Sequence, residues 1–171
     1  EEIGSSGSTG LESNYIEYFM ADIINKVNGE YNEINLKKTL WNSKALSADV
    51  NDAINPMFKE VHDSLNAAKL GYGIVVTKYT GSGGKYSSND ADAEFVHEIR
   101  TLLNKNNITW QIGMLGKVDE GGGGTVAKYL ANFGIRTIDV GPALLAMHSP
   151  FELASKFDIY ETYISYKVFY K

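Results

Sequence analysis

Two adjacent carboxylates, Glu1 and Glu2, are the first candidates for chemistry. A Glu-Glu pair is by itself an ordinary surface feature, but here Ile3-Gly4 and a loop of small residues, 5–10, follow it directly. We therefore expect the pair at the end of a strand, where open α/β sheets hold their ligands. Because neighbouring side chains in a strand point to opposite sides, both carboxylates reach one site only where the backbone turns.

The three histidines differ in their surroundings. His62 and His97 stand among polar residues or on a helical pattern, and we expect both to be partly exposed residues without a ligand role. His148 follows the apolar segment 143–147, so that a structural role and a place in a site are equally open. Since the chain has no cysteine, any bound metal must be held by His, Asp and Glu.

A glycine cluster, Gly121 to Gly124, precedes Thr125 and a helical pattern. The exposed N–H groups of a helix start can hold a phosphate, a carboxylate or a developing oxyanion. No Gly-Lys-Ser/Thr follows, and the spacing of a dinucleotide fingerprint is absent. Taken alone, this cluster and the glycines at 81–84 are turns.

The periodicity of apolar residues places these candidates on an α/β framework. Apolar residues recur at three- and four-residue steps in 13–28, 90–104 and 125–133, which predicts helices, and Asn28-Gly29 should end the first. The segments 44–49, 73–77, 108–115 and 135–140 predict strands, with a glycine-rich loop after 77. We expect a three-layer α/β fold in which helices flank a mostly parallel or mixed sheet.

A last helix is predicted from residue 149 onward. Ser149-Pro150-Phe151-Glu152 has a hydroxyl N-cap, a proline at the first helical position and a glutamate three residues after the cap, which is the pattern of a capping box. The side that should dock on the sheet is apolar and consists of Phe151, Ala154, Phe157, Tyr160, Ile164 and Val168.

Length and composition limit the classes of protein. A chain of 171 residues that is 43% hydrophobic can bury one core of ordinary size, so we expect a single α/β unit. The net charge of -5 argues against a nucleic-acid partner. No window approaches the 18 or so apolar residues of a membrane span, and we expect a soluble, cytoplasmic protein without a membrane partner.

Five motifs in order resemble the aminopeptidase I/aspartyl aminopeptidase family of dinuclear zinc enzymes. They are Glu1-Glu2-Ile3-Gly4-Ser5, Ser47-Ala48-Asp49, the segment from Lys78 through Tyr86-Ser87-Ser88-Asn89, Gly123-Gly124-Thr125 and Ala146-Met147-His148-Ser149. The resemblance spans nearly the whole chain. It implies a peptide-hydrolysing catalytic domain with two zinc ions per site, although cobalt or manganese suits the same ligands, and assembly into a homo-oligomer, a dodecamer.

Within this resemblance, four residues match the reacting centre. Glu1 matches the general base and Glu2 a ligand of one zinc, which His148 shares, whereas Asp49 matches a ligand of the other zinc. Two divalent cations polarise a scissile carbonyl and lower the pKa of water, while a carboxylate that binds no metal transfers the proton. The two adjacent carboxylates would thus have different roles.

Further residues match the substrate side of the family's site. Lys78 and Tyr86 match residues that line it, and Gly124-Thr125 matches a segment near the bound peptide. The family often carries histidines where this chain has Asp52 and Asn55. Lys78 would favour acidic N-terminal residues and Asp52 would oppose them, so neutral or hydrophobic N-terminal residues are at least as plausible.

The family's first metal-binding histidine, its bridging aspartate and its dimerisation domain would precede Glu1. We therefore expect residues 1–171 to be the C-terminal portion of a catalytic domain, inactive alone, that is completed by an N-terminal portion of the same protein. Two alternatives are a subunit of the same fold that serves only in assembly, and an α/β domain that binds anions at the helix start Gly121–Thr125.

Overall fold

The structure is a computed structural model that describes residues 5–83 and 85–171. The described chain divides into two compact units. The smaller consists of the residues up to Ala45 together with Val126–Thr137, and the larger of Leu46–Thr125 together with Ile138–Lys171. All the described candidate site residues belong to the larger unit.

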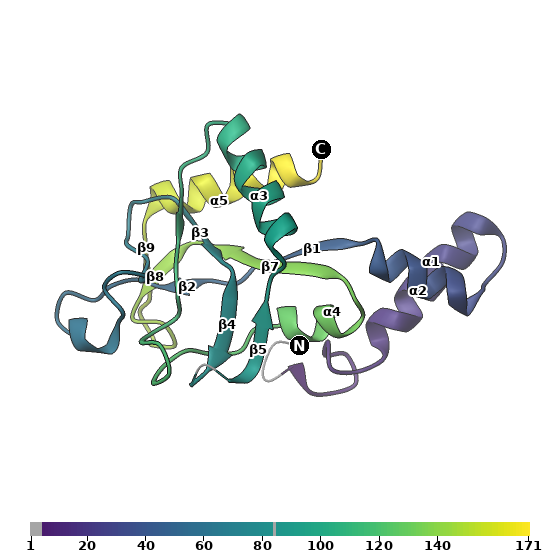
Figure 1. The fold of residues 1–171 in the computed structure, drawn as a ribbon, viewed down its shortest axis with the longest axis horizontal. Helices are drawn as coiled ribbons and strands as arrows, with labels where there is room; N and C mark the ends of the chain where they lie inside the picture. The colour runs from purple at the N-terminus through teal and green to yellow at the C-terminus, as the bar shows by residue number, and fades with distance from the viewer. Residues whose placement is uncertain (1–4, 84) are drawn as a thin grey trace. The chain divides into compact units, whose positions relative to one another are not determined.

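Helices and strands alternate along the chain (Figure 1). The helices are α1 (Tyr15–Asn28), α2 (Glu33–Trp41), α3 (Ala93–Lys105), α4 (Ala127–Asn132) and α5 (Lys156–Phe169), with a short 3-10 helix at Lys59–Val61. The strands are β1 (Lys44–Ser47), β2 (Asn51–Asp52), β3 (Ile74–Thr77), β4 (Tyr79–Ser82), β5 (Tyr86–Asp90), β6 (Trp110–Ile112), β7 (Arg136–Gly141), β8 (Ala143–Leu145) and β9 (Leu153–Ala154).

The smaller unit is built from α1, α2 and α4 around an apolar cluster of Ile24, Leu36, Leu40 and Ile135. Helix α1 ends at Gly29, whose φ of 77° is the left-handed conformation that closes a helix at little cost in glycine. The predicted helix 13–28 and its end are thus confirmed.

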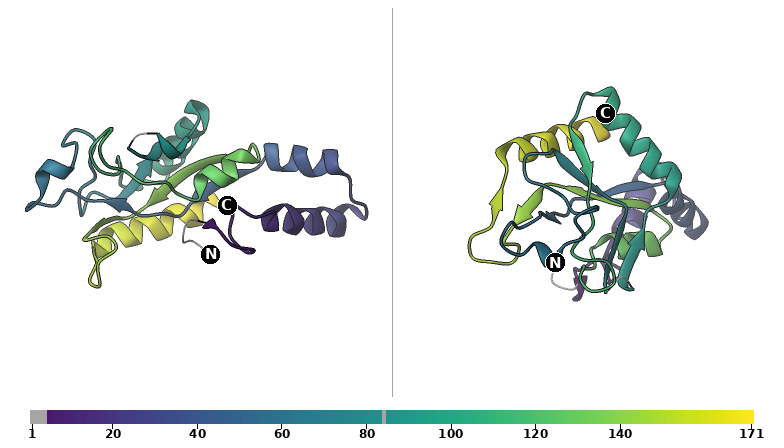
Figure 2. Two further views of the ribbon diagram at one scale, coloured as in Figure 1. Left: turned by 90° about the horizontal axis from the view of Figure 1, so that it is seen from below. Right: turned by 60° about the vertical axis from the view of Figure 1, so that its left-hand side comes forward.

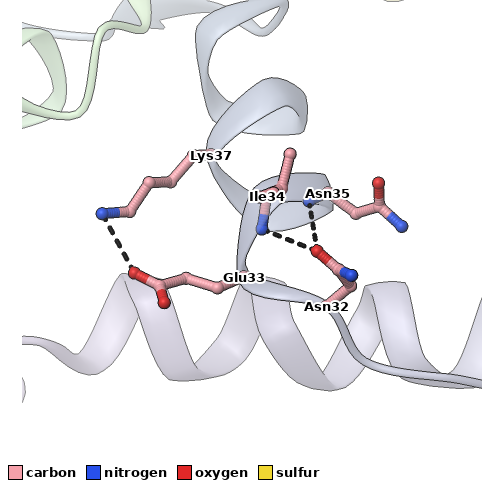
Figure 3. A network of polar contacts seen from close by, with 5 residues as sticks. All are labelled: Asn32, Glu33, Ile34, Asn35 and Lys37. Atoms are coloured by element: carbon pink, nitrogen blue, oxygen red, sulfur yellow. Dashed lines mark hydrogen bonds and ion pairs between the residues drawn. The ribbon is translucent and has the colours of Figure 1, made fainter.

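Helix α2 begins with a side-chain cap (Figure 3). Asn32 Oδ1 accepts hydrogen bonds from the backbone N–H groups of Ile34 (2.8 Å) and Asn35 (3.4 Å), which would otherwise have no partner in the first turn. Lys37 pairs with Glu33 one turn earlier at 3.1 Å. These local contacts stabilise the first turn of α2, and Leu36 and Leu40, one turn apart, are buried.

The larger unit contains most of a four-stranded mixed sheet in the order β1-β7-β3-β6. Strand β3 runs parallel to β6 and antiparallel to β7. All four residues of β3 are buried, as expected for an inner strand whose sequence is a β-branched run. The predicted α/β class with a mixed sheet flanked by helices is confirmed.

Helices α3 and α5 cover one face of this sheet. In both Figure 1 and the right-hand view of Figure 2 they lie on the same side of the strands. The core on this side contains Ile74 and Val76 of β3, Ile138 and Val140 of β7, and Phe95 of α3. Alternate residues of each strand therefore face the helices.

The remaining strand residues face the other way. Val75 packs with Ala53, Ala68 and Ala143, next to a second sheet in the order β2-β8-β9. Thr77 pairs directly with Asp139 across β3 and β7, and cross-strand partners share a face. The face opposite the helices thus carries polar residues at its buried centre.

The glycine-rich loop predicted after residue 77 is instead a hairpin. Strands β4 and β5 pair antiparallel, with an irregular register between Thr80 and Ser82. The N–H groups of Gly81 and Gly83 donate to the carbonyls of Gly123 (2.9 Å) and Gly121 (2.7 Å). A β-carbon on Gly122 would lie 2.2 Å from the oxygen of Gly81, so the glycines serve close backbone contact.

The predicted start of the last helix was wrong. Helix α5 begins at Lys156, and Ser155 Oγ accepts from the backbone N–H of Asp158 at 3.4 Å. Ser149 Oγ instead closes a turn with the N–H of Phe151 at 3.2 Å, and Glu152 Oε1 accepts from the N–H of His148 at 2.6 Å. These two side chains have the chemistry of a capping box but stabilise a turn.

The predicted docking face of this helix was also wrong in large part. The buried residues of α5 are polar, namely Asp158, Glu161, Thr162 and Ser165. Phe151 lies outside the helix and is 89% exposed, whereas Ile164 and Val168 do pack on the core. Buried polar groups dominate because the helix supplies hydrogen bonds to loop backbones.

Helix α4 begins at Ala127, later than predicted, and has six residues without a side-chain cap. So short a helix with its start beyond Thr125 gives little support to an anion site there. Over the described ranges, 5–83 and 85–171, none of the helices combines the length and apolarity that crossing a bilayer requires.

Candidate metal and substrate site

The two residues at the front of the predicted site, Glu1 and Glu2, lie outside the described residues. Their predicted roles as general base and zinc ligand stay predictions. The rest of the predicted site consists of Asp49, Lys78, Tyr86, Gly124-Thr125 and His148, all of which lie among the described residues.

Asp49 follows the end of β1 by two residues, as the sequence predicted. It is partly buried, and its Oδ1 accepts from the N–H of Val50 at 2.8 Å. Its backbone lies against β7, because a β-carbon on Gly141 would come within 2.0 Å of the Asp49 carbonyl oxygen. The turn that presents the Asp49 carboxylate is thereby held on the polar face of the sheet.

Asp139 is a second carboxylate on this face. It is 3% exposed, and burial raises its pKa to about 6, an effect that the nearby charge of Asp49 adds to. The hydroxyl groups of Ser47 and Thr125 lie near enough to lower that pKa. Within the described chain, neither Asp139 oxygen nor Ser47 Oγ has a hydrogen-bond partner of normal geometry. Asp139 is therefore a buried acid with unmet hydrogen-bonding capacity.

His148 lies in a tight turn after β8. Both Ala146 (φ 57°) and His148 (φ 66°) have left-handed backbone conformations that are costly for residues with a side chain. The turn is held by the N–H of Ser149 donating to the carbonyl of Ala146 at 3.0 Å and by Glu152. The imidazole is exposed. A strained turn that presents an exposed imidazole is compatible with a ligand role.

Two of the predicted substrate-side segments lie together. Gly124 packs on Ser87, the neighbour of Tyr86, so closely that a β-carbon on Gly124 would be 2.4 Å from that of Ser87. Tyr86 is 76% exposed at the start of β5. Thr125 follows directly and approaches Asp139. The stretch Gly124-Thr125 therefore lies between Ser87 of β5 and the Asp139 carboxylate.

Lys78 lies between β3 and β4 and forms an ion pair with Asp90 at the end of β5. Both side chains are substantially exposed. The positive charge of Lys78, which was expected to favour an acidic substrate residue, is thus already paired with Asp90.

A mainly apolar hollow of 260 Å³ opens beside the glycine loop. Its wall includes Tyr79, Thr80, Met114, Leu115 and Val118. Thr80 is 3% exposed, and its hydroxyl has no hydrogen-bond partner within the described chain. The hollow therefore offers mainly apolar contacts to an occupant.

The expectation for His62 was wrong. This histidine is 7% exposed, and its Nε2 accepts from the N–H of Asn55 at 3.2 Å. The proton of the neutral ring then lies on Nδ1, which is 3.4 Å from Asp52 Oδ2, outside hydrogen-bond alignment. Burial raises the pKa of Asp52, and His62 partly offsets that rise. Asp52 and Asn55, where the resembling family often has histidines, are thus both engaged by one histidine.

Sequence reasoning also missed Asp139. A signal was present, since Asp139 is the one carboxylate inside the predicted strand 135–140 and alternates with Ile138 and Val140. No comparable signal exists for His62, because its burial depends on how the loop after β2 folds back.

The described residues contain no group of three or more His, Asp or Glu side chains that could hold a metal. The described candidates are one carboxylate, Asp49, and one imidazole, His148, which is the ligand chemistry that zinc accepts. The unsatisfied acid Asp139 beside Asp49 fits the surroundings of a metal ligand, which is commonly supported by further hydrogen-bonding groups. The residue types of Asp49 and His148 suit zinc, and their roles as ligands stay a proposal.

Comparison with known proteins identifies the family. The family model for aminopeptidase I zinc metalloproteases (M18) matches residues 1–170. The chain belongs to this family. It is 64% identical over its whole length to a probable M18 family aminopeptidase 1 of Borrelia garinii subsp. bavariensis, and 50% identical over 98% of its length to the corresponding protein of Thermotoga maritima.

Solved structures agree with this assignment. An M18-family aminopeptidase from Thermotoga maritima matches 97% of the chain with a TM-score of 0.92 and 49% identity, covering 37% of that protein's chain. Aminopeptidase I from Clostridium acetobutylicum matches 99% of the chain with a TM-score of 0.87 and 47% identity, covering 36% of that chain. The chain spans 38% of the length of its Borrelia garinii relative.

Proposed function

We propose that residues 1–171 form the C-terminal portion of the catalytic domain of a zinc metallo-aminopeptidase, which hydrolyses N-terminal residues from peptides. The observation that carries this proposal is the family match over residues 1–170. Asp49 at a strand end, on the polar face of the sheet and beside a buried acid, supports it. An N-terminal portion of the same protein would complete the site.

In this proposal Glu2 and His148 bind one zinc ion and Asp49 binds the other. Carboxylate and imidazole ligands suit zinc, and cobalt or manganese could occupy the same positions. The exposed imidazole of His148, in its strained turn, is accessible to a metal, and the fixed backbone of Asp49 orients its carboxylate.

Bound zinc would supply a polarising charge for the scissile carbonyl and a water molecule of lowered pKa. Glu1, unligated, takes the proton from that water and delivers it to the leaving amine. Gly124-Thr125, which packs on Ser87, and the neighbouring Tyr86 bind the peptide near this centre. Holding the scissile bond in a reactive orientation increases the rate of hydrolysis.

Neutral or hydrophobic N-terminal residues suit this site better than acidic ones. The ion pair with Asp90 reduces the positive charge that Lys78 offers to an acidic residue. The hollow lined by Met114, Leu115 and Val118 offers apolar contacts. We therefore propose a preference for uncharged N-terminal residues.

We also propose that the whole protein assembles into a homo-oligomer, a dodecamer, and acts in the cytoplasm. The fold is shared with mApe1 of S. cerevisiae and with PhTET1-12s, each described as a dodecamer. The absence of cysteine is compatible with the reducing cytoplasm.

The test compares a polypeptide of the relatives' full length that contains this chain with residues 1–171 alone. With added zinc or cobalt, the longer protein should release N-terminal residues from peptides and residues 1–171 should not. Glu1→Gln in the longer protein should lower kcat by several orders of magnitude while metal stays bound. Activity of residues 1–171 alone, or an unchanged kcat in Glu1→Gln, would refute the assignment.

A further inference from the structure

The buried acid Asp139 lies where several segments of the proposed site meet. On its own strand, β7, it is two residues before Gly141, so both face the same side of the sheet. Gly141 is covered by the backbone of Asp49, and the hydroxyl of Ser47, two residues before Asp49, approaches Asp139. The segment Ser47–Asp49 therefore runs along this face of β7.

The segment that ends in Thr125 reaches Asp139 from another direction. The backbone of Gly121 and Gly123 is hydrogen-bonded to β4, and Gly124 packs on Ser87 of β5. Thr125 leaves this fixed stretch with its hydroxyl near the Asp139 carboxylate. Asp139 is thus a neighbour both of the zinc-ligand segment and of the peptide-binding segment.

Cross-strand pairing adds a third contact to this face. Thr77 lies directly opposite Asp139, and its Oγ1 accepts from Asn51 Nδ2 at 2.7 Å. Asn51 follows Asp49 by two residues, so Ser47 and Asn51 tie the segment to the sheet on both sides of Asp49. Ser47 approaches Asp139 and Asn51 donates to Thr77, so both contacts end on the same cross-strand pair.

A comparison with Asp158 shows what is unusual about Asp139. Asp158 is fully buried, and its two oxygens accept from the N–H groups of Gly71 and Gly73, both at 2.8 Å. Asp139 receives no such backbone donors, and hydroxyl groups that can rotate are its nearest donors. A buried carboxyl group is tolerated only if such donors are available to it.

We infer that Asp139 is a positioning residue that holds the Ser47–Asp49 and Gly124–Thr125 segments together through the Ser47 and Thr125 hydroxyl groups that approach its carboxylate. The inference rests on the proposed function, since it concerns the zinc ligand Asp49 and the peptide-binding Thr125. The role requires hydrogen-bonding capacity at position 139 and not a negative charge. An amide can serve, because a hydroxyl group both donates and accepts.

The experiment uses the full-length polypeptide and two variants, Asp139→Asn and Asp139→Leu. Zinc affinity is measured by competition with a chromophoric chelator, and kcat and KM are measured separately with a peptide substrate. Asp139→Leu should weaken zinc binding by about tenfold or more, the usual effect of losing a group that orients a ligand, and should raise KM. Asp139→Asn should remain within a few-fold of wild type in both measurements.

Asp158→Asn is the matched control, because it changes another buried carboxylate, whose oxygens accept from Gly71 and Gly73. It should lower thermal stability and leave zinc affinity unchanged. If Asp139→Leu does not fold, Ser47→Ala is the deciding variant. It removes one hydroxyl donor, keeps the buried acid and should weaken zinc binding. Wild-type zinc affinity in a folded Asp139→Leu, or in Ser47→Ala, would overturn the inference. Equal impairment of Asp139→Asn and Asp139→Leu would also overturn it, because charge would then be required.

The proposed function fails separately from the inference. A wild-type polypeptide without zinc-dependent release of N-terminal residues would refute the function whatever the variants do. An active wild type with unaffected variants would refute only the role of Asp139.

Discussion

The carbonyl group of Asp49 lies directly against Gly141, where a β-carbon would come within 2.0 Å of the carbonyl oxygen. Gly141→Ala must therefore displace the backbone that presents the Asp49 carboxylate. We expect the variant of the full-length polypeptide to bind zinc at least about tenfold more weakly, because a misplaced ligand loses metal affinity. Chelator competition measures the change.

Gly73→Ala is the matched control for this substitution. Its β-carbon would lie 2.0 Å from the Thr109 carbonyl oxygen, and its φ of 88° adds strain, so it should destabilise the fold at least as much. Gly73 precedes β3, whereas the site lies toward Thr77 at the other end of that strand. Equal loss of zinc affinity in both variants would mean that general destabilisation, and not displacement of Asp49, is responsible.

The pKa of Asp139 predicts a pH dependence of stability. Its folded-state pKa of about 6 exceeds that of the unfolded chain, so the folded state binds the proton more tightly. The contribution of Asp139 protonation to the free energy of unfolding is complete below about pH 4. It falls by roughly 2 to 3 kcal/mol in all as the pH rises through about 6. Asp139→Asn should remove this loss.

The measurement is urea unfolding of chelator-treated wild type and Asp139→Asn between pH 4 and 8. The difference in free energy of unfolding should grow with pH in favour of the variant. A constant difference across this range would contradict a raised pKa.

Asp158 should matter for stability more than any exposed carboxylate. Asp158→Ala leaves the N–H groups of Gly71 and Gly73 without their acceptors, and hydrogen bonds to charged groups contribute about 1.5 to 3 kcal/mol each. We expect a loss of roughly 3 kcal/mol or more in chemical denaturation. Glu33→Ala, which removes an exposed ion pair with Lys37, should cost far less, because exposed ion pairs contribute little to stability.

His62 and Asp52 should be energetically coupled. His62→Leu removes the acceptor for the N–H of Asn55 and the group that offsets the raised pKa of Asp52, so we expect a loss of about 1 to 3 kcal/mol. In a double-mutant cycle with Asp52→Asn, the two effects should not add. If the two losses in free energy of unfolding add to within about 0.5 kcal/mol, the contact between the His62 imidazole and the Asp52 carboxylate contributes nothing.

The sequence predicted those parts of the fold that depend on local periodicity. The helix ending at Gly29 follows from apolar spacing, the strand before Asp49 from a short run of small residues, and the inner strand 74–77 from a β-branched run. The last helix was misplaced because Ser149 and Glu152 have the right spacing for a capping box and instead close a turn. A side-chain pattern cannot distinguish these outcomes when the neighbouring strand pairing of β9 with β8 decides between them.

The same division holds for the site. Asp49 and His148 were proposed from short motifs, and their ligand roles stay predictions. Asp49 lies at the predicted strand end, whereas the strained turn at His148 was not predicted. The contacts of His62 with Asp52 and Asn55 and of Asp139 with Ser47 and Thr125 were not predicted. They join residues that come together only when the strands pair, and no local pattern contains that information.

The alternation of residues along β7 has a consequence for folding. Ile138 and Val140 belong to the apolar core under α3 and α5, whereas Asp139 and Gly141 face the other side. A shift of the strand by one residue would place the carboxylate among Phe95 and Ile74 and would bring a valine against the carbonyl of Asp49. Both errors are costly, so a slipped pairing is strongly disfavoured, and the residues that form the proposed site also select the correct alignment of the strand.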